Sequence, residues 1–209
     1  MKTKIIKKCC DWRLVKNECR NTVNKDFTDH EPTSKFKEKL LLAEHSPINI
    51  IRIHFRWEGI KSWISVHFAR HWLGWLKWIS TQRTDRTGVN RDKAPQDTPV
   101  NMDVEADAQA LINVGRVRLC YQASTETREY AEDLKVSIKE EAGEPELSNV
   151  LVPNCIYRGG CPEMFPCEHN LWGRFLAYVK KNDLPINSIK DRYDAYNQYF
   201  YATRQEVDK

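Results

Sequence analysis

The chain has 209 residues, which fits one domain with a sizeable core, and 41% of them are hydrophobic. Lysine and arginine exceed aspartate and glutamate by only 33 to 29, and this net charge of +4 is too small to indicate a protein that coats nucleic acid. The chain has no run of about 18 apolar residues, and residues 1–16 lack a signal-peptide core, so we expect a cytoplasmic protein outside the membrane. Seven dispersed cysteines favour free thiols over a disulfide framework.

The first third of the chain predicts a short strand, a helix and a longer strand. Residues 4–8 form the short strand. A helix with Ser34 as its N-cap must stop near residue 46, because Pro47 restricts the backbone of the residue before it. Residues 48–58 then alternate polar and apolar side chains with the period of a half-buried strand. The buried side of this strand is predicted to carry Ile51, Ile53, Phe55 and Trp57.

Residues 62–79 switch to the spacing of a helix, which places Arg70 and His71 in one arc. The polar segment 80–101 contains glycine and prolines and predicts a long loop, and loops of this length are often binding loops. Guanidinium groups bind phosphate bidentately and stack on flat rings. The arginines and tryptophans between residues 62 and 86 therefore favour a nucleotide as the ligand.

Two long helices are predicted for residues 104–120 and 124–141. Residues 150–172 predict a loop rich in Cys, Gly and Pro, and a helical aromatic tail follows it. Four possible zinc ligands in or beside this loop lack the short spacing of a zinc knuckle, so we predict reduced structural thiols and no metal site. These residues form a C-x5-C-x5-C-x-H pattern made of Cys155, Cys161, Cys167 and His169.

Four short motifs resemble, in the same order, those of the flavin-dependent thymidylate synthases. Residues 70–72 and 81–84 resemble the two ends of the family signature R-H-R-x-x-S-x-N-x-x-S-x-R-Y, with one inserted residue. "CRNT" at 19–22 resembles A-R-x-S, and "HSP" at 45–47 resembles the S-P turn before the family's strand. The longest match resembles N-x4-R-x4-A-Q-x-E-I-R and places in register Asn113, Arg118, Ala123, Glu126 and Arg128.

This resemblance implies an α+β fold, a mixed α/β single domain of the thymidylate-synthase-complementing-protein type with an antiparallel sheet flanked by long helices. We predict the family-like domain at residues 1–145 and a Cys- and aromatic-rich extension of unknown role at residues 146–209. Family members are homotetramers whose active sites combine residues of several subunits, so the resemblance implies self-association as a homotetramer.

For activity, the resemblance implies reductive methylation of dUMP to dTMP with FAD, NADPH and methylene-tetrahydrofolate as the carbon donor. Arg118 is the implied catalytic residue, because a fixed guanidinium against a uracil oxygen stabilises negative charge that develops in the ring. The implied dUMP-binding residues are His67, Arg70, Thr81, Gln82, Arg83 and Arg118. The implied FAD-binding residues are Ser46, Arg70, His71, Trp72 and Asn113.

The chain departs from the family pattern at several site positions. Asn49-Ile50 stands for the family's E-H, Trp72 for its second signature arginine, and Trp75 and Lys77 for its signature Ser and Asn. Stacking by Trp72 or Trp75 on the flavin or adenine ring is one replacement for a lost charged contact. Two other functions stay open, namely hydroxymethylation of dUMP by the same fold, and non-catalytic binding of a nucleotide or single-stranded nucleic acid.

Overall fold

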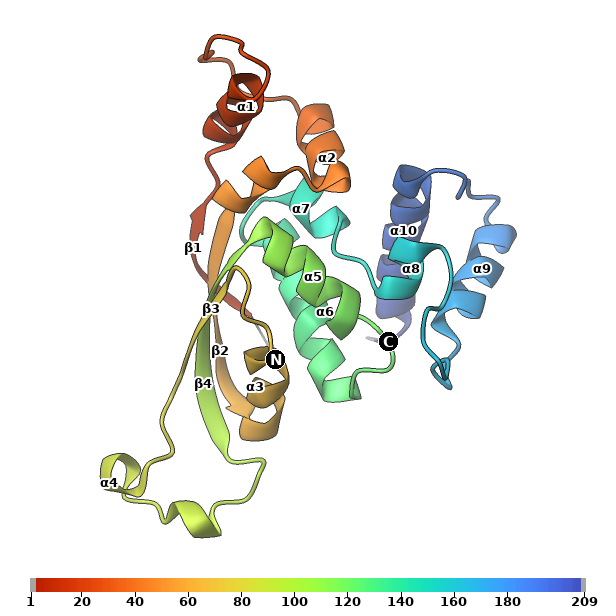
Figure 1. Cartoon of the computed structure of the whole chain (residues 1–209). Coiled ribbons are helices and arrows are strands. Elements are labelled where there is room, and N and C mark those ends of the chain that lie inside the picture. Colours follow the sequence, from red (N-terminus) through yellow and green to blue (C-terminus); the bar gives the residue numbers. More distant parts are fainter. Residues whose placement is uncertain (1–2, 208–209) are drawn as a thin grey trace.

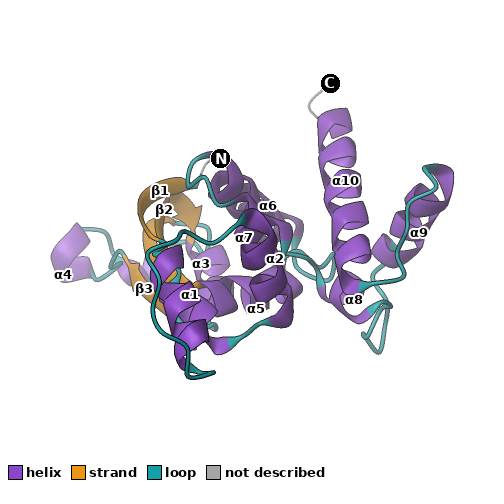
Figure 2. Cartoon of the chain, turned by 90° about the horizontal axis from the view of Figure 1, so that it is seen from above, coloured by secondary structure: helices purple, strands orange, loops and turns teal. Residues whose placement is uncertain are grey.

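The computed structural model describes residues 3–207. A sheet with strand order β1–β2–β4–β3, antiparallel throughout, is covered on one face by α3, α5 and α6 (Figure 1). The helices α8, α9 and α10 lie beyond α6, away from the sheet (Figure 2). The elements are β1 Lys4–Cys9, α1 Trp12–Asn21, α2 Ser34–Ala43, η1 Ser46–Ile50, β2 Arg52–Lys61, α3 Ser62–Ala69, β3 Trp75–Ile79, α4 Thr84–Thr87, η2 Arg91–Lys93, β4 Pro99–Asp107, α5 Ala108–Arg118, α6 Thr125–Glu140, α7 Pro145–Asn149, α8 Asn154–Arg158, α9 Leu171–Lys181 and α10 Ile189–Val207.

The main core lies between the sheet and the covering helices. The central strand β2 directs Ile53, Phe55 and Trp57 into this core, where all three are fully buried. The centroid of the Trp57 ring lies 4.5 Å from that of Phe68 in α3 and 5.4 Å from that of Tyr130 in α6. The expected mixed fold with an antiparallel sheet and long helices is confirmed, as is the buried face of this strand, although β2 begins only at residue 52 because residues 46–50 form η1.

The predicted helix over residues 62–79 is wrong in its second half. Helix α3 ends at Ala69, the chain turns back through Gly74, and a strand begins at Trp75. Gly74 has a φ of +65°, and a Cβ atom there would overlap the Asp107 carboxylate, so this turn requires glycine. The segment WLKWI is apolar at four of its five positions, so neither the helical nor the strand period stands out in the sequence.

The helix predicted for residues 104–120 begins too early. Residues 104–107 are the last part of β4, and α5 starts directly afterwards with Asp107 as its N-cap. The Asp107 carboxylate accepts a hydrogen bond from the Ala110 amide at 2.8 Å. No loop separates strand from helix, so the two periods merge in the sequence. The strand period is visible in the buried residues Val100, Met102, Val104 and Ala106.

Other predictions need smaller corrections. The α2 helix is capped by Thr33 and not by Ser34, since the Thr33 hydroxyl accepts from the Phe36 amide at 3.3 Å. The loop 80–101 is shorter, because β4 starts at residue 99, and it forms an arm with α4 that projects beyond the sheet (Figure 1). The loop 150–172 contains α8. No helix within residues 3–207 combines the length and the apolar character needed to cross a bilayer.

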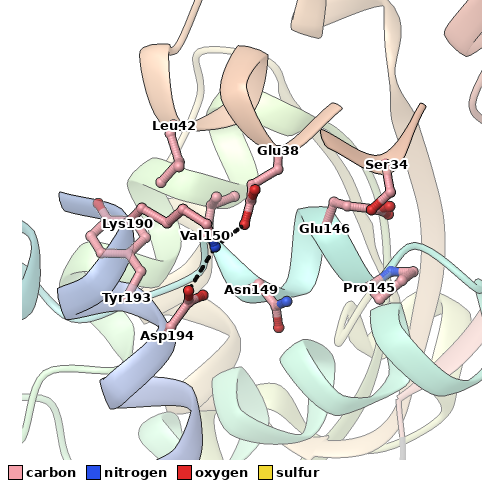
Figure 3. Close-up of a pocket in the computed structure, with 10 residues that line it drawn as sticks. All are labelled: Ser34, Glu38, Leu42, Pro145, Glu146, Asn149, Val150, Lys190, Tyr193 and Asp194. Atoms are coloured by element: carbon pink, nitrogen blue, oxygen red, sulfur yellow. Dashed lines mark hydrogen bonds and ion pairs between the residues drawn. The ribbon is translucent and has the colours of Figure 1, made fainter. Parts of the chain in front are cut away.

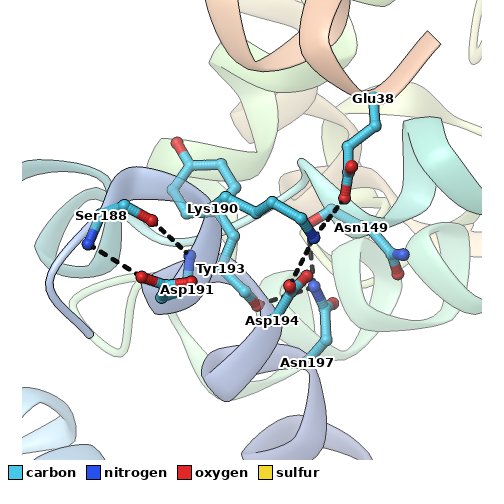
Figure 4. Close-up of polar contacts among 8 residues, drawn as sticks. All are labelled: Glu38, Asn149, Ser188, Lys190, Asp191, Tyr193, Asp194 and Asn197. Carbon is cyan, nitrogen blue, oxygen red and sulfur yellow. Dashed lines mark hydrogen bonds and ion pairs between the residues drawn. The ribbon is translucent and has the colours of Figure 1, made fainter. Parts of the chain in front are cut away.

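The last helix, α10, packs beside α2 and α7, and residues of these three helices line a hollow of about 520 Å³ (Figure 3). The Lys190 ammonium donates to Glu38 at 2.6 Å and to Asp194 at 2.7 Å (Figure 4). The helix start is closed by Ser188 and Asp191, whose side chains each accept from the other's amide. The Lys190 ammonium is thus already paired with Glu38 and Asp194 of the same chain. We therefore infer that this hollow is where α10 packs on the body and is not a catalytic site.

A buried lysine ties α6 to the C-terminal helices. The Lys135 ammonium is fully buried and donates to the Ser148 carbonyl at 2.6 Å and to Asn197 Oδ1 at 2.7 Å. Burial, and then the charge of Lys139, lowers the pKa of Lys135 from 10.5 to about 7. The folded chain therefore favours the neutral amine over much of the range in which the unfolded chain is protonated.

This pKa predicts that stability rises with pH above neutrality. Between pH 7 and 10.5 the unfolded chain binds a proton at Lys135 that the folded chain does not, so raising the pH removes a penalty on folding of at most about 1.4 kcal/mol per pH unit. Urea unfolding at pH 7 and pH 9 should show this rise in the parent relative to Lys135→Met. The matched surface variant Lys180→Met should keep the rise, and equal slopes for the parent and Lys135→Met would contradict the assignment.

Candidate active site

A polar hollow forms where the end of α3 faces the side of α5. The turn that follows α3 supplies Arg70, His71, Trp72 and Leu73, and α5 supplies Ala110, Asn113 and Val114 to a hollow of about 420 Å³. The backbone fixes both walls, because the Asp107 amide that precedes α5 donates to the Gly74 carbonyl at 2.9 Å. Residues that are about 40 positions apart in the sequence therefore share one corner of the fold.

Arg118, the last residue of α5, is held against α3 by its guanidinium. Its Nε donates to His71 Nε2 at 3.1 Å, and a terminal nitrogen donates to the His67 carbonyl at 2.5 Å. The Lys77 ammonium of β3 donates to the His71 carbonyl at 2.7 Å. A strand, a turn and two helices thus contribute to the hydrogen bonds around His71 and Arg118, which is what a preorganised site requires.

Arg118 also lines a second hollow, on the C-terminal side of α5. This hollow has a volume of about 530 Å³, and its lining includes Cys120, Gln122, Asn154 and Glu163. The Arg118 guanidinium thus contacts His71, which lines the first hollow, and it lines the second hollow itself. A group in this position can touch a ligand in the second hollow and can orient His71 at the first.

The charge at this corner is positive and lacks carboxylate partners. Arg70 is exposed, and no ion pair is found for Arg70 or Arg118 within residues 3–207. Burial, and then the charge of Arg70, lowers the pKa of Arg118, although a guanidinium stays protonated in proteins. Two neighbouring guanidinium groups that no carboxylate pairs with make a site that attracts anions such as phosphate.

His71 is a neutral hydrogen-bond acceptor in this arrangement. Burial, followed by the charges of Arg118 and Lys77, lowers the pKa of His71 from 6.5 to about 4. Because Nε2 accepts from Arg118, we assign the ring proton to Nδ1. Burial, followed by the charges of Arg118 and Arg70, also lowers the pKa of His67, so both histidines favour the uncharged state.

Comparisons with known proteins identify the fold. No protein-family model matches the chain, and no curated protein matches it by sequence. Two solved structures of ThyX from Helicobacter pylori, each with FAD and dUMP, are similar to this chain. One matches with a TM-score of 0.59 and 11% identity, over 72% of this chain and 99% of that one. The other matches with a TM-score of 0.57 and 10% identity, over 70% of this chain and 98% of that one. The UMP/dUMP methylase PolB from Streptomyces cacaoi, bound with 5-Br dUMP, matches with a TM-score of 0.56 and 12% identity, over 73% of this chain and 95% of that one.

The chain has the fold of the flavin-dependent thymidylate synthases. The expected ThyX-like, thymidylate-synthase-complementing-protein-like fold is confirmed by these structures. In this ThyX-like fold the sequence-predicted residues His67, Arg70, His71, Trp72, Asn113 and Arg118 lie around the corner between α3 and α5. Trp72 is 72% exposed, so its ring is free to cover a ligand in the first hollow.

Other predicted residues of the ThyX-like site lie elsewhere in the chain. Thr81, Gln82 and Arg83 stand at the base of the projecting arm, and Arg83 is paired with Asp85 at 2.8 Å. Ser46 starts η1, which packs on α5, but it does not line the first hollow. Within one subunit the arm residues are therefore not gathered with Arg118.

The structure also revises which aromatic and basic residues belong to the site. Trp75 is 1% exposed, with its ring 5.7 Å from that of Phe55, so it is a core residue and is not available to stack on a cofactor. Lys77 joins the site through His71, a contact that the assumed helix over 62–79 hid. Reading WLKWI as a strand that returns beside β4 would have found it.

The geometry predicts an unusually acidic titration for His71. Its resonances in histidine-labelled protein, assigned by comparison with His71→Gln, should titrate near pH 4 and not near 6.5. The folded pKa is the lower one, mainly because the ring is buried and then because of Arg118 and Lys77, so the uncharged His71 contributes stability that is fully present above pH 6.5 and is lost as the pH falls through 4. Arg118→Ala should raise the midpoint, and a midpoint of 6.5 in the parent would show that the two side chains do not meet.

Proposed function

We propose that the protein is a ThyX-type enzyme that methylates dUMP reductively to dTMP, with FAD, NADPH and methylene-tetrahydrofolate. The observation that carries this proposal is the Arg118 guanidinium, which His71 and His67 hold between two hollows and which has no carboxylate partner in the described part of the chain. The ThyX-like fold and the bound FAD and dUMP of its structural neighbours support the choice of ligands.

The first hollow has the donor set that a flavin nucleotide requires. The Arg70 guanidinium suits a diphosphate, the exposed Trp72 ring suits stacking on a flat ring, and the exposed Asn113 carboxamide can both donate and accept. The side of α5 closes the hollow with the apolar Ala110 and Val114. Bound FAD would supply hydride chemistry, and these residues would hold and orient it.

Arg118 would act on the pyrimidine. Its charge, aimed at a uracil oxygen, would stabilise the negative charge that develops in the ring when C5 attacks the one-carbon donor. The neutral His71 would fix the guanidinium in place without adding a second positive charge that must be neutralised. His67 would contribute through its carbonyl, which holds a terminal nitrogen of the fork.

The arm residues enter this proposal through assembly. Thr81, Gln82 and Arg83 lie on an exposed arm that extends beyond its own sheet (Figure 1). In a homotetramer, as the family resemblance implies, the arm of one subunit would reach the corner of another and bind the dUMP phosphate there. Arg83 would then exchange its exposed partner Asp85 for the ligand, at little cost because exposed ion pairs are weak.

Replacing Arg118 tests the catalytic role. Arg118→Ala should lower the rate of dTMP formation from dUMP, methylene-tetrahydrofolate, NADPH and FAD by about 10²-fold or more, because one preorganised donor is lost. Arg118→Lys keeps the charge but not the two parallel N–H donors, so its rate should lie between those of Arg118→Ala and the parent. Arg158→Ala, which changes an exposed arginine of α8, is the control.

Product analysis by mass spectrometry decides among the functions. Formation of dTMP by the parent supports the proposal, whereas a product heavier by one oxygen would indicate hydroxymethylation. A parent that binds single-stranded nucleic acid with steep salt dependence and forms neither product would indicate a non-catalytic binder.

Replacing Trp72 tests the cofactor position. Trp72→Ala should weaken FAD binding about tenfold, because stacking on an aromatic ring is worth about 1–3 kcal/mol. Trp78→Ala is a matched control, since Trp78 is also an exposed tryptophan but belongs to β3 and does not line the hollow. Affinity would be measured from the quenching of flavin fluorescence. Equal affinities for the parent and Trp72→Ala would place the flavin elsewhere.

A further inference from the structure

Four cysteines from three segments line one cavity beside the α5 end. The lining of this cavity is mostly apolar apart from the thiols and a few polar groups. Its cysteines are Cys120, just after α5, Cys155 of α8, and Cys161 and Cys167 of the loop before α9. His169, the fourth ligand of the C-x5-C-x5-C-x-H pattern, does not line this cavity and instead has its ring 5.3 Å from that of Tyr121.

The four thiols of this cavity are available as metal ligands. All seven cysteines are free, so the four thiols are not consumed in disulfides. Four cysteine side chains line this one cavity, and four cysteine sulfurs, deprotonated when the metal binds, are a ligand set of structural zinc sites.

We propose that Cys120, Cys155, Cys161 and Cys167 form a structural zinc site. Binding exchanges four thiol protons for one Zn²⁺, which leaves a centre of charge −2. This charge would lie beside the hollow that Arg118 lines, which shares Cys120, Gln122 and Glu163 with the thiol cavity. The zinc centre would fix the end of the helix that carries Arg118, because Cys120 follows this arginine by two residues.

Metal binding requires the loop before α9 to move inward. As they stand, no three His, Cys, Asp or Glu side chains in the described part of the chain are arranged to hold an ion. Cys161 is exposed and Cys167 is half-buried, whereas Cys155 is buried in the body. The loop leaves α8 through Gly159, whose φ is +73°, and a side chain on Gly160 would meet nothing within 4 Å. The two glycines at the beginning of the loop, Gly159 and Gly160, have the conformational freedom and the space to let the loop close on the cavity.

Metal analysis of the full-length protein, purified without a metal-affinity tag and refolded with zinc, tests the site. The parent should retain about one zinc per chain after dialysis, and Cys161→Ser and Cys167→Ser should each retain less than about a tenth. Both changed side chains are outside the buried core, so circular dichroism should show folded variants. Cobalt in place of zinc should give the visible bands of a tetrahedral thiolate complex in the parent alone.

Two controls define the ligand set. Cys9→Ser alters an exposed cysteine of β1, and His169→Ala removes the ligand that the sequence pattern suggested, so both should keep about one zinc. Loss of zinc in His169→Ala, disulfides in place of thiols, an iron–sulfur spectrum, or less than about a tenth of an equivalent in the parent would each overturn the proposal. Metal content is independent of thymidylate synthesis, so failure of the proposed activity leaves this test intact.

Discussion

The hydrogen bond from Arg118 to His71 is the constraint on which the candidate site depends. It joins the last residue of α5 to the turn after α3, and it requires an uncharged imidazole. Protonation of His71 would place two positive charges close together, and like charges about 4 Å apart repel by about 4 kcal/mol in a partly screened environment. This repulsion exceeds the roughly 1 kcal/mol of an ordinary hydrogen bond, so the neutral form prevails and the guanidinium keeps both its position and its full charge.

The sheet makes this contact possible. The turn at Gly74 and the start of α5 meet at Asp107, whose amide donates to Gly74 and whose carboxylate caps α5. One residue therefore sets both the direction of the helix and the path of the turn. The hydrogen-bonded pairing of β3 with β4 extends the same register from Trp75 onward, so the two walls of the first hollow are fixed by backbone bonds and not by flexible side chains.

Much of the fold follows from residue patterns that have one clear period. The alternation of Ile51 to Trp57 predicts a half-buried strand, and the α6 helix was expected at nearly its observed bounds. Errors fall where periods merge, at WLKWI and at the junction of β4 with α5. For the site, motif spacing brings Arg70, His71, Asn113 and Arg118 to one corner, but only the three-dimensional structure shows that the arm with Arg83 lies apart and that Lys77 contacts His71.

The cysteines show a different limit of reading a sequence. Spacing along the chain groups Cys155, Cys161 and Cys167 with the nearby His169, because only local separation is visible there. Folding brings Cys120 from 35 positions before Cys155 to the same cavity, through the packing of α8 against α5. Cys120, the cysteine that local spacing leaves out, is thus one of the residues that this cavity shares with the Arg118 hollow. The C-terminal segment therefore bears on the site through the end of α5, where a change in the thiol cavity is only two residues from the Arg118 guanidinium.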